Sequence, residues 1–283
     1  MKKFVLLLAS VGAMLSLNSC LQNEMTITVK ADGSGTVVEE TVFGAQMSAM
    51  MGGLGGLGGE AGAPQENPLD EMFSKDKAKE KAAKMGEGVT VAKVEKIDKD
   101  GKKGGRVTYA FKDINKLKLG LGSGMDALDS MGPPGADGEG EEGEKEEIED
   151  PVQFKLEGKK LTVILPQPDK DAKAPDVEIP EKEEEKSPED AQAEAMAKAM
   201  FADMKISVKL VIEPGIEKCD ASHVDGNTIT LMEMNFGELM KNEKGMKLLD
   251  QMEDKSPQEV AKLVEGIDGV SFESKEKITV DMK

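Results

Sequence analysis

The chain has 283 residues and a net charge of −18, with 55 acidic against 37 basic side chains. A surface this acidic repels nucleic acid, so a nucleic-acid partner is excluded. The chain has no Trp, one Tyr and eight Phe, so aromatic ligand platforms are scarce, and its single His excludes a His-rich metal centre.

The N-terminus has the pattern of a secretion signal. Lys2 and Lys3 precede an uncharged apolar run from Phe4 to Leu17. At about 14 residues this run is shorter than the roughly 20 that a membrane-spanning helix needs. We therefore predict that residues 1–19 are a signal peptide that is removed.

The signal ends in a pattern that resembles a bacterial lipobox, Leu17-Asn18-Ser19-Cys20. Lipidation requires a thiol at Cys20, and the small Ser19 admits the peptidase to the bond between the two residues. We predict lipidation of Cys20, cleavage between Ser19 and Cys20, and anchoring to a membrane. Leu21 is not the Asp that retains lipoproteins in the inner membrane, so the sequence favours the outer membrane.

The N-terminal region, residues 25–119, follows a short lipidated tether at residues 20–24. Alternation predicts strands at Met25–Lys30 and Thr36–Phe43 around a turn at residues 32–35. A Gly- and Met-rich insertion at residues 44–67 precedes a helix predicted over Leu69–Met85. Strands at Val89–Ile97 and Arg106–Phe111 form the second predicted hairpin.

The middle of the chain is dominated by segments that we do not expect to pack. Residues 120–150 form an acidic linker and residues 166–188 a linker rich in Pro and charge, both predicted to be disordered. Between them, residues 151–165 form a third predicted hairpin, with strands at Gln153–Leu156 and Lys160–Leu165. The Glu-rich run from Glu139 to Asp150 is interpreted as a solvated loop.

The C-terminal region, residues 189–283, is predicted to combine helices and strands and to pack with the N-terminal region. Helices are expected from Ser187 to about Met204 and from Ser256 to about Gly266. The expected strands lie at Ile206–Ile212, Ile216–Ala221, Asn227–Leu231 and Val270–Asp281. The second and third of these strands are predicted to pair across a turn at Asp225-Gly226. Hairpins separated by helices indicate an α+β fold with an antiparallel sheet.

Several segments together resemble LppM-like bacterial lipoproteins. They are Leu210-Val-Ile-Glu-Pro-Gly-Ile216, Asp220-Ala-Ser222, Val224-Asp-Gly-Asn-Thr-Ile-Thr-Leu231 and the turn Asp32-Gly-Ser-Gly-Thr36. The chain departs from the family pattern at Cys219, where Ser or Thr is usual, and at Asp220, where Asn is usual. The resemblance implies an α+β sheet domain on a lipid anchor, and it supplies no catalytic residues.

Three local patterns share residue types with reactive sites and are interpreted as structural. Ser222, His223 and Asp225 are too close in sequence for a triad, so His223 is expected to be an exposed turn residue. Cys219 is expected to be a half-buried strand thiol, since one Cys is used by the lipid and no partner remains. The run from Asp98 to Gly101 lacks the spacing of a calcium loop and is expected to be a turn.

Composition and motifs leave two classes of function. We favour a non-enzymatic binding or structural component of the cell envelope, with an unknown envelope protein or small ligand as its partner and with neither metal nor cofactor. The alternative is a periplasmic hydrolase that uses a pair of carboxylates, since Asp and Glu are abundant. Two facing carboxylates, one of them with a raised pKa, would favour the hydrolase.

Overall fold

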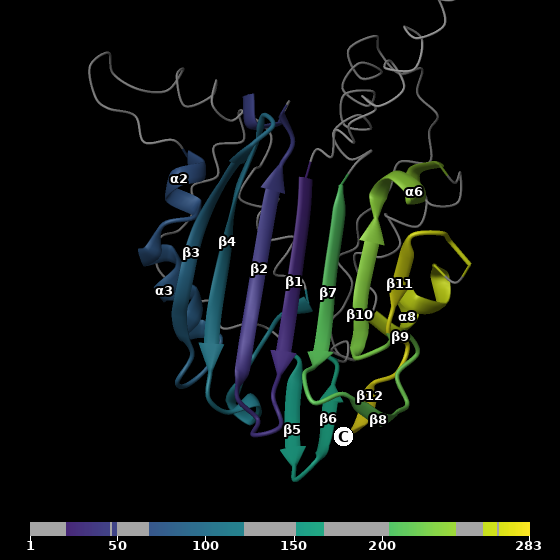
Figure 1. Ribbon diagram of the computed structural model, residues 1–283. Coiled ribbons are helices and arrows are strands. Elements are labelled where there is room, and N and C mark those ends of the chain that lie inside the picture. Colours follow the sequence, from purple (N-terminus) through teal and green to yellow (C-terminus); the bar gives the residue numbers. More distant parts are fainter. Residues whose placement is uncertain are drawn as a thin grey trace, which may run out of the picture.

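A computed structural model describes residues 21–45, 47–49, 68–121, 151–166, 204–241, 257–264 and 266–283. These residues form two β-sheets with short helices (Figure 1). The strands are β1 (Leu21–Val29), β2 (Gly35–Phe43), β3 (Thr90–Lys99), β4 (Lys102–Phe111), β5 (Gln153–Glu157), β6 (Lys160–Ile164), β7 (Lys205–Ile212), β8 (Ile216–Cys219), β9 (Val224–Asp225), β10 (Thr228–Asn235), β11 (Val270–Phe272) and β12 (Lys277–Met282). The helices are α2 (Pro68–Met72), α3 (Lys75–Lys84), the 3₁₀ turn η1 (Ile114–Lys116), α6 (Phe236–Lys241) and α8 (Pro257–Leu263).

The large sheet has the strand order β11-β10-β7-β1-β2-β4-β3, and β9 pairs with β10 beside it. Its centre is a parallel pair, β1 with β7, in which Met25 lies opposite Val208. All the other pairs of this sheet are antiparallel. The parallel pair therefore joins the strands from the N-terminal part of the chain to those from the C-terminal part.

The small sheet has the order β5-β6-β12-β8 and lies at the end of the large sheet where β1 turns into β2 (Figure 1). The chain passes between the two sheets five times, and the passages from β7 to β8, from β8 to β9 and from β11 to β12 lie wholly within the described residues. Both sheets contribute to one hydrophobic cluster, which includes Ile27 of β1, Leu210 of β7 and Val280 of β12, each at most 1% exposed.

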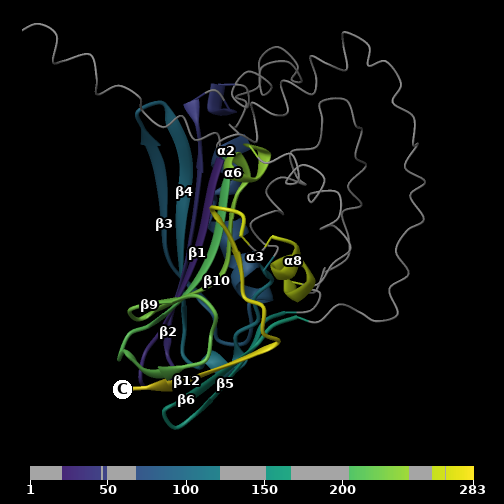
Figure 2. The same ribbon diagram turned by 90° about the vertical axis from the view of Figure 1, so that its right-hand side faces the viewer.

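The large sheet has one buried side and one exposed side. Along β1, Met25, Ile27 and Val29 are buried, whereas the alternate residues Thr26 and Thr28 are partly exposed. Figure 2 shows α3 and α8 on the same side of this sheet, and Ala78 and Ala82 of α3 are buried there. The alternation of strand side chains thus places the apolar residues under the helices and leaves a polar surface on the other side.

The predicted α+β class is wrong, because strands make up most of the described residues. The predicted helix over Leu69–Met85 is two short helices, which are separated at Phe73 and Ser74, and Ser74 caps α3 by accepting a hydrogen bond from Lys77 N. The predicted helix that ends near Met204 falls almost entirely outside the described residues, as do residues 120–150 and 166–188 and most of the insertion at 44–67. The expected domain boundaries stay predictions.

Three predicted hairpins are confirmed: β1–β2, β3–β4 and β5–β6. The predicted pairing of Ile216–Ala221 with Asn227–Leu231 is wrong, because β8 pairs with β12 in the small sheet while β10 pairs with β7. The single predicted strand over Val270–Asp281 is two strands in different sheets, with Glu273 at the break. The first strand begins at Leu21 rather than Met25, inside the expected tether.

Close packing explains a Gly-Gly pair within β4. A Cβ atom at Gly104 would overlap the carbonyl of Thr41 on β2, and one at Gly105 would overlap the ring of Phe73. Phe73 follows α2 and is itself buried. Gly105 therefore lets the residue that links α2 to α3 lie directly on the sheet.

Candidate functional site

The predicted lipidation site lies outside the described residues, since these begin at Leu21. Leu21 is the first residue of β1 and is 1% exposed. Cys20 is therefore joined by one peptide bond to a central strand of the large sheet. Cleavage at Ser19 and lipidation at Cys20 stay predictions.

The exposed side of the large sheet is the candidate binding surface, and we call it the polar face. It is formed by every second residue of the long strands. A row of polar side chains crosses it, and we call these residues the charged row: Glu233, Ser207, Glu24, Glu40, Arg106 and Glu95. Strand pairing sets the order of the row. On one half, Ser207 of β7 lies opposite Glu233 of β10 and Glu24 of β1. Glu24 in turn lies opposite Glu40 of β2, and Arg106 of β4 lies between Glu40 and Glu95 of β3.

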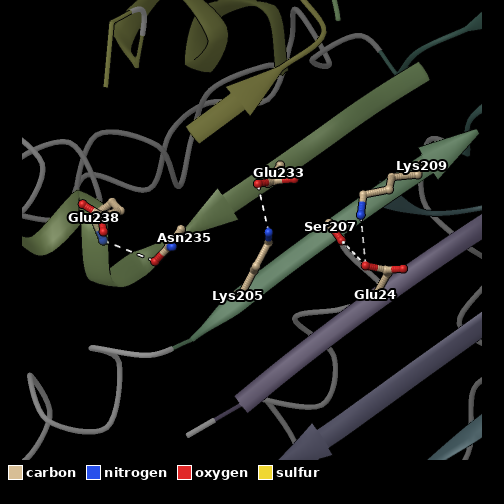
Figure 3. Close-up of polar contacts among 7 residues, drawn as sticks. All are labelled: Glu24, Lys205, Ser207, Lys209, Glu233, Asn235 and Glu238. Carbon is tan, nitrogen blue, oxygen red and sulfur yellow. Dashed lines mark hydrogen bonds and ion pairs between the residues drawn. The ribbon is translucent and has the colours of Figure 1, made fainter. Parts of the chain in front are cut away.

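Figure 3 shows the half of the charged row that spans the parallel pair. Lys209 Nζ donates to Glu24 Oε2 at 3.0 Å, and Ser207 Oγ lies 3.5 Å from the same oxygen. Lys205 Nζ pairs with Glu233 Oε1 at 3.0 Å. Lys205, Ser207 and Lys209 alternate along β7, so a single strand supplies two cations to this face, with the buried hydroxyl of Ser207 between them.

The other half of the row has the same design. Arg106 of β4 pairs with Glu40 of β2, and Lys93 of β3 pairs with Glu95 at 2.8 Å. Burial by itself would raise the pKa of Glu24, but the hydrogen bond and charge of Lys209 outweigh it and hold the pKa below its ordinary value. The hydrogen bond from Lys93 lowers the pKa of Glu95. These two carboxylates are therefore ionised at neutral pH.

A second polar cluster lies on the buried side of the sheet, under α3. Lys81 of α3 pairs with Glu39 of β2 at 3.0 Å, and the side chain of Glu39 is 13% exposed. Tyr109 of β4 is buried, and burial together with the negative charge of Glu39 raises the pKa of its phenol. Tyr109 is consequently neutral, and the cluster fixes α3 on the sheet.

The residues at the junction of the two sheets do not form a triad. Ser222 Oγ and Ser222 N both donate to the carboxylate of Glu273, each at 2.7 Å. The ring of His223 lies at hydrogen-bond distance, 3.2 Å, from the carbonyl oxygen of Phe272, and Asp225 is on β9. The expectation that His223 is an exposed turn residue is confirmed. The hydroxyl of Ser222 is held by the carboxylate of Glu273, and the ring of His223 contacts the carbonyl of Phe272.

Glu273 is the buried carboxylate at this junction, with 0% exposure. In addition to Ser222, the backbone N–H of Lys275 donates to it at 3.0 Å. On the neighbouring crossing segment, Asp220 Oδ1 accepts from Thr279 N at 2.7 Å. These contacts connect the segment that follows β8 with the segment that runs from β11 into β12, so the junction is structural.

Cys219 is on β8 and is half-buried, as expected. Burial raises the pKa of its thiol, and the carboxylates of Asp220 and Glu273 act in the same direction. The thiol is therefore protonated at neutral pH, which disfavours nucleophilic chemistry.

The segment from Asp98 to Gly101 contains the expected turn, at Asp100 and Gly101, whereas Asp98 and Lys99 are the last residues of β3. Asp100 and Gly101 both have positive φ, 56° and 77°, and they connect β3 to β4 as a two-residue hairpin turn. Within the described ranges, no cluster of three or more His, Cys, Asp or Glu side chains has the arrangement of a metal site. No helix of the described part is long and apolar enough to span a membrane.

Sequence reasoning did not identify the charged row or Glu273. Alternation along Met25–Lys30 could have shown that Glu24 belongs to the polar side of its strand. Its partner Lys209 is 185 positions away, however, and only the pairing of β1 with β7 brings the two together. The strand predicted over Val270–Asp281 contains Glu273, whose burial has no local signal.

Comparison with known proteins gives a limited result. No family model matches the chain, and no curated protein matches it. Among solved structures, it is similar to the NMR structure of the folded domain of LppM from Mycobacterium tuberculosis, at 8% identity and a TM-score of 0.30. The similarity covers 78% of this chain and 85% of that one. It agrees with the sequence resemblance as a weak likeness of fold, and at this TM-score it carries no argument about function.

Proposed function

We propose that this chain is an extracytoplasmic lipoprotein, anchored through a lipid on Cys20, whose polar face binds a partner in the cell envelope. The proposal rests on one observation above all: the strand at the centre of the large sheet begins at Leu21, directly after the lipobox cysteine. A lipid on Cys20 would hold the sheet at the membrane with no spacer between them. Leu21 in place of Asp favours the outer membrane.

A binding role, or a structural role, follows from the polar face. It extends over seven strands and carries ion pairs whose charges remain partly accessible, with side chains of Lys209 and Glu24 that are 26% and 51% exposed. A partner with complementary charges can replace these ion pairs with its own contacts, because breaking an exposed ion pair lowers the free energy of unfolding by only about 0–1 kcal/mol. We therefore assign binding to this face.

No observation in the described part of the chain favours the alternative hydrolase. Glu24 and Glu40 do lie opposite each other, but each is paired with a cation. Wherever a described Asp or Glu has a shifted pKa, the shift is downward, as for Glu24 and Glu95. A general acid for hydrolysis needs a shift in the opposite direction.

The anchor is tested by growing cells with a radioactive fatty acid and isolating the protein. We expect label in the wild type and in Cys219→Ala, and none in Cys20→Ala. The two variants each remove one thiol, so Cys219→Ala controls for the loss of a cysteine. Equal labelling of the Cys20→Ala protein and the wild type would contradict the proposal.

The binding face is tested by photo-cross-linking in cells. A cross-linking amino acid is placed at Thr26 or Thr108, which lie on the polar face, and at Lys84, an exposed residue of α3 on the other side of the sheet. We expect a discrete cross-linked product from the first two positions and none from Lys84. Products of the same size and yield from all three positions would contradict a binding role for this face.

A further inference from the structure

The end of the large sheet nearest Cys20 also carries the β3–β4 hairpin. Leu21 of β1 lies opposite Phe43 of β2, which lies opposite Lys103 of β4. Two steps between strands cover about 10 Å, since neighbouring strands are roughly 4.8 Å apart. The turn at Asp100 and Gly101 is therefore at the anchored end of the sheet, as Figure 1 shows.

This hairpin places two like charges opposite each other. Lys99 and Lys102 are the last pair before the turn, and neither forms an ion pair with any described residue. Like charges directly opposite on neighbouring strands are destabilising. The chain has 18 more acidic than basic side chains, so two unpaired lysines side by side are unusual for its composition.

The β5–β6 hairpin provides the contrast. Its last pair before the turn is Glu157 with Lys160, which are opposite charges. Figure 1 shows this hairpin at the other end of the molecule, beyond the turn between β1 and β2. β1 alone has 9 residues and spans about 30 Å, so this hairpin would be far from an anchored membrane.

We propose that Lys99 and Lys102 of the β3–β4 hairpin contact anionic phospholipid headgroups of the membrane to which the chain is anchored. The inference rests on the proposed lipid anchor, because that anchor brings this end of the sheet to the bilayer. A phosphate between the two ammonium groups removes their repulsion. Lysines near an anionic bilayer are attracted to its headgroups, and this attraction can orient a chain that is already anchored. Asp98 and Asp100 reduce the net positive charge of the hairpin, so its attraction to the membrane is weak. The contact therefore orients the domain, and the lipid on Cys20 remains the anchor.

The test uses the lipidated full chain in vesicles of phosphatidylcholine, with and without phosphatidylglycerol. A fluorophore is attached at Asp98→Cys or, as the matched position at the other hairpin, at Glu157→Cys, both in a Cys219→Ser background. A spin-labelled headgroup in the vesicles quenches a fluorophore that is close to the surface. We expect quenching at position 98 to be at least twofold stronger with phosphatidylglycerol than without, and quenching at position 157 to be weak in both.

Charge reversal supplies the decisive comparison. The variant K99E/K102E should lose the effect of phosphatidylglycerol on quenching at position 98, whereas K159E/K160E, with the same change in charge, should keep it. High salt should also abolish the effect, because it screens surface charge.

Quenching at position 98 that is independent of phosphatidylglycerol in the acylated protein would overturn this inference and leave the anchor intact. Absence of acylation on Cys20 would overturn both, and mass spectrometry separates the two results.

Discussion

Glu273 is the residue whose local contacts best explain the arrangement of the two sheets. Its carboxylate is fully buried and accepts hydrogen bonds from three donors on Ser222 and Lys275. A buried group of this kind is costly to leave unsatisfied, at about 1–3 kcal/mol for each lost partner. One side chain therefore links the segment that follows β8 to the segment that follows β11.

Glu273→Ala removes the acceptor from all three donors. We expect it to lower the free energy of unfolding by about 1–3 kcal/mol, since the hydrogen bonds that link Ser222 and Lys275 to the buried carboxylate are lost. The exposed Glu276, which is near it on the same segment, provides a control with the same change in charge. Urea unfolding measures both variants, and equal stability of Glu273→Ala and Glu276→Ala would contradict a special role for Glu273.

Glu24 predicts a dependence of stability on pH. Its folded-state pKa is lower than its unfolded value, so its stabilising effect is present above the ordinary carboxyl pKa and is lost as pH falls through the folded pKa. Because the side chain is 51% exposed, we expect Glu24→Gln to cost at most about 1 kcal/mol at pH 7. Urea unfolding at pH 7 and at pH near 3 should show the difference from wild type shrink at the lower pH. A difference that grows at the lower pH would show that the sign is wrong.

At the scale of the elements, the contact of Phe73 with Gly105 fixes the break between α2 and α3. Gly105→Ala places a methyl group where the ring of Phe73 lies. We expect a loss of about 1–3 kcal/mol, as for other overpacked sites. Phe73→Ala also destabilises the protein, but it opens the space that the new methyl needs. The double variant should consequently be more stable than the sum of the two single effects predicts, and strict additivity would contradict the contact.

Local patterns in the sequence predict the hairpins well and the sheet order poorly. Asp100-Gly101 and the turn at residues 32–34 require particular backbone angles, and this chemistry is visible in the sequence. The pairing of β1 with β7 has no such signal, because each strand shows only its own alternation. For the same reason the sequence pairs β8 with the wrong neighbour and does not identify Lys209 as the partner of Glu24.

The error in fold class has a related cause. The Ala- and Lys-rich sequence of Leu69–Met85 favours a helix throughout, and helix propensity alone does not show that Phe73 leaves the helix to pack on β4. Likewise, Val270–Asp281 has the composition of one strand. In the structure it forms β11 and β12, which belong to different sheets, and the buried Glu273 lies between them. Tertiary packing decides both.

At the scale of the whole molecule, the β1–β7 pair predicts cooperative unfolding. Tyr109 is the only tyrosine, in a chain without Trp, so its fluorescence reports on β4 and the N-terminal strands. A fluorophore on Cys219 of β8 reports on the C-terminal part. We expect both probes to report the same midpoint urea concentration, because the N-terminal and C-terminal strands form one sheet and neither set can fold without the other. Two separate transitions would contradict this.

The proposed function depends on a lipid on Cys20 that holds the large sheet at a membrane and leaves the polar face free to bind. Intact-mass spectrometry of the protein from the membrane fraction tests this dependence. We expect a mature chain that begins at Cys20 and carries the added mass of a diacylglycerol. A chain that begins at another residue, or an unmodified Cys20, would contradict the proposal.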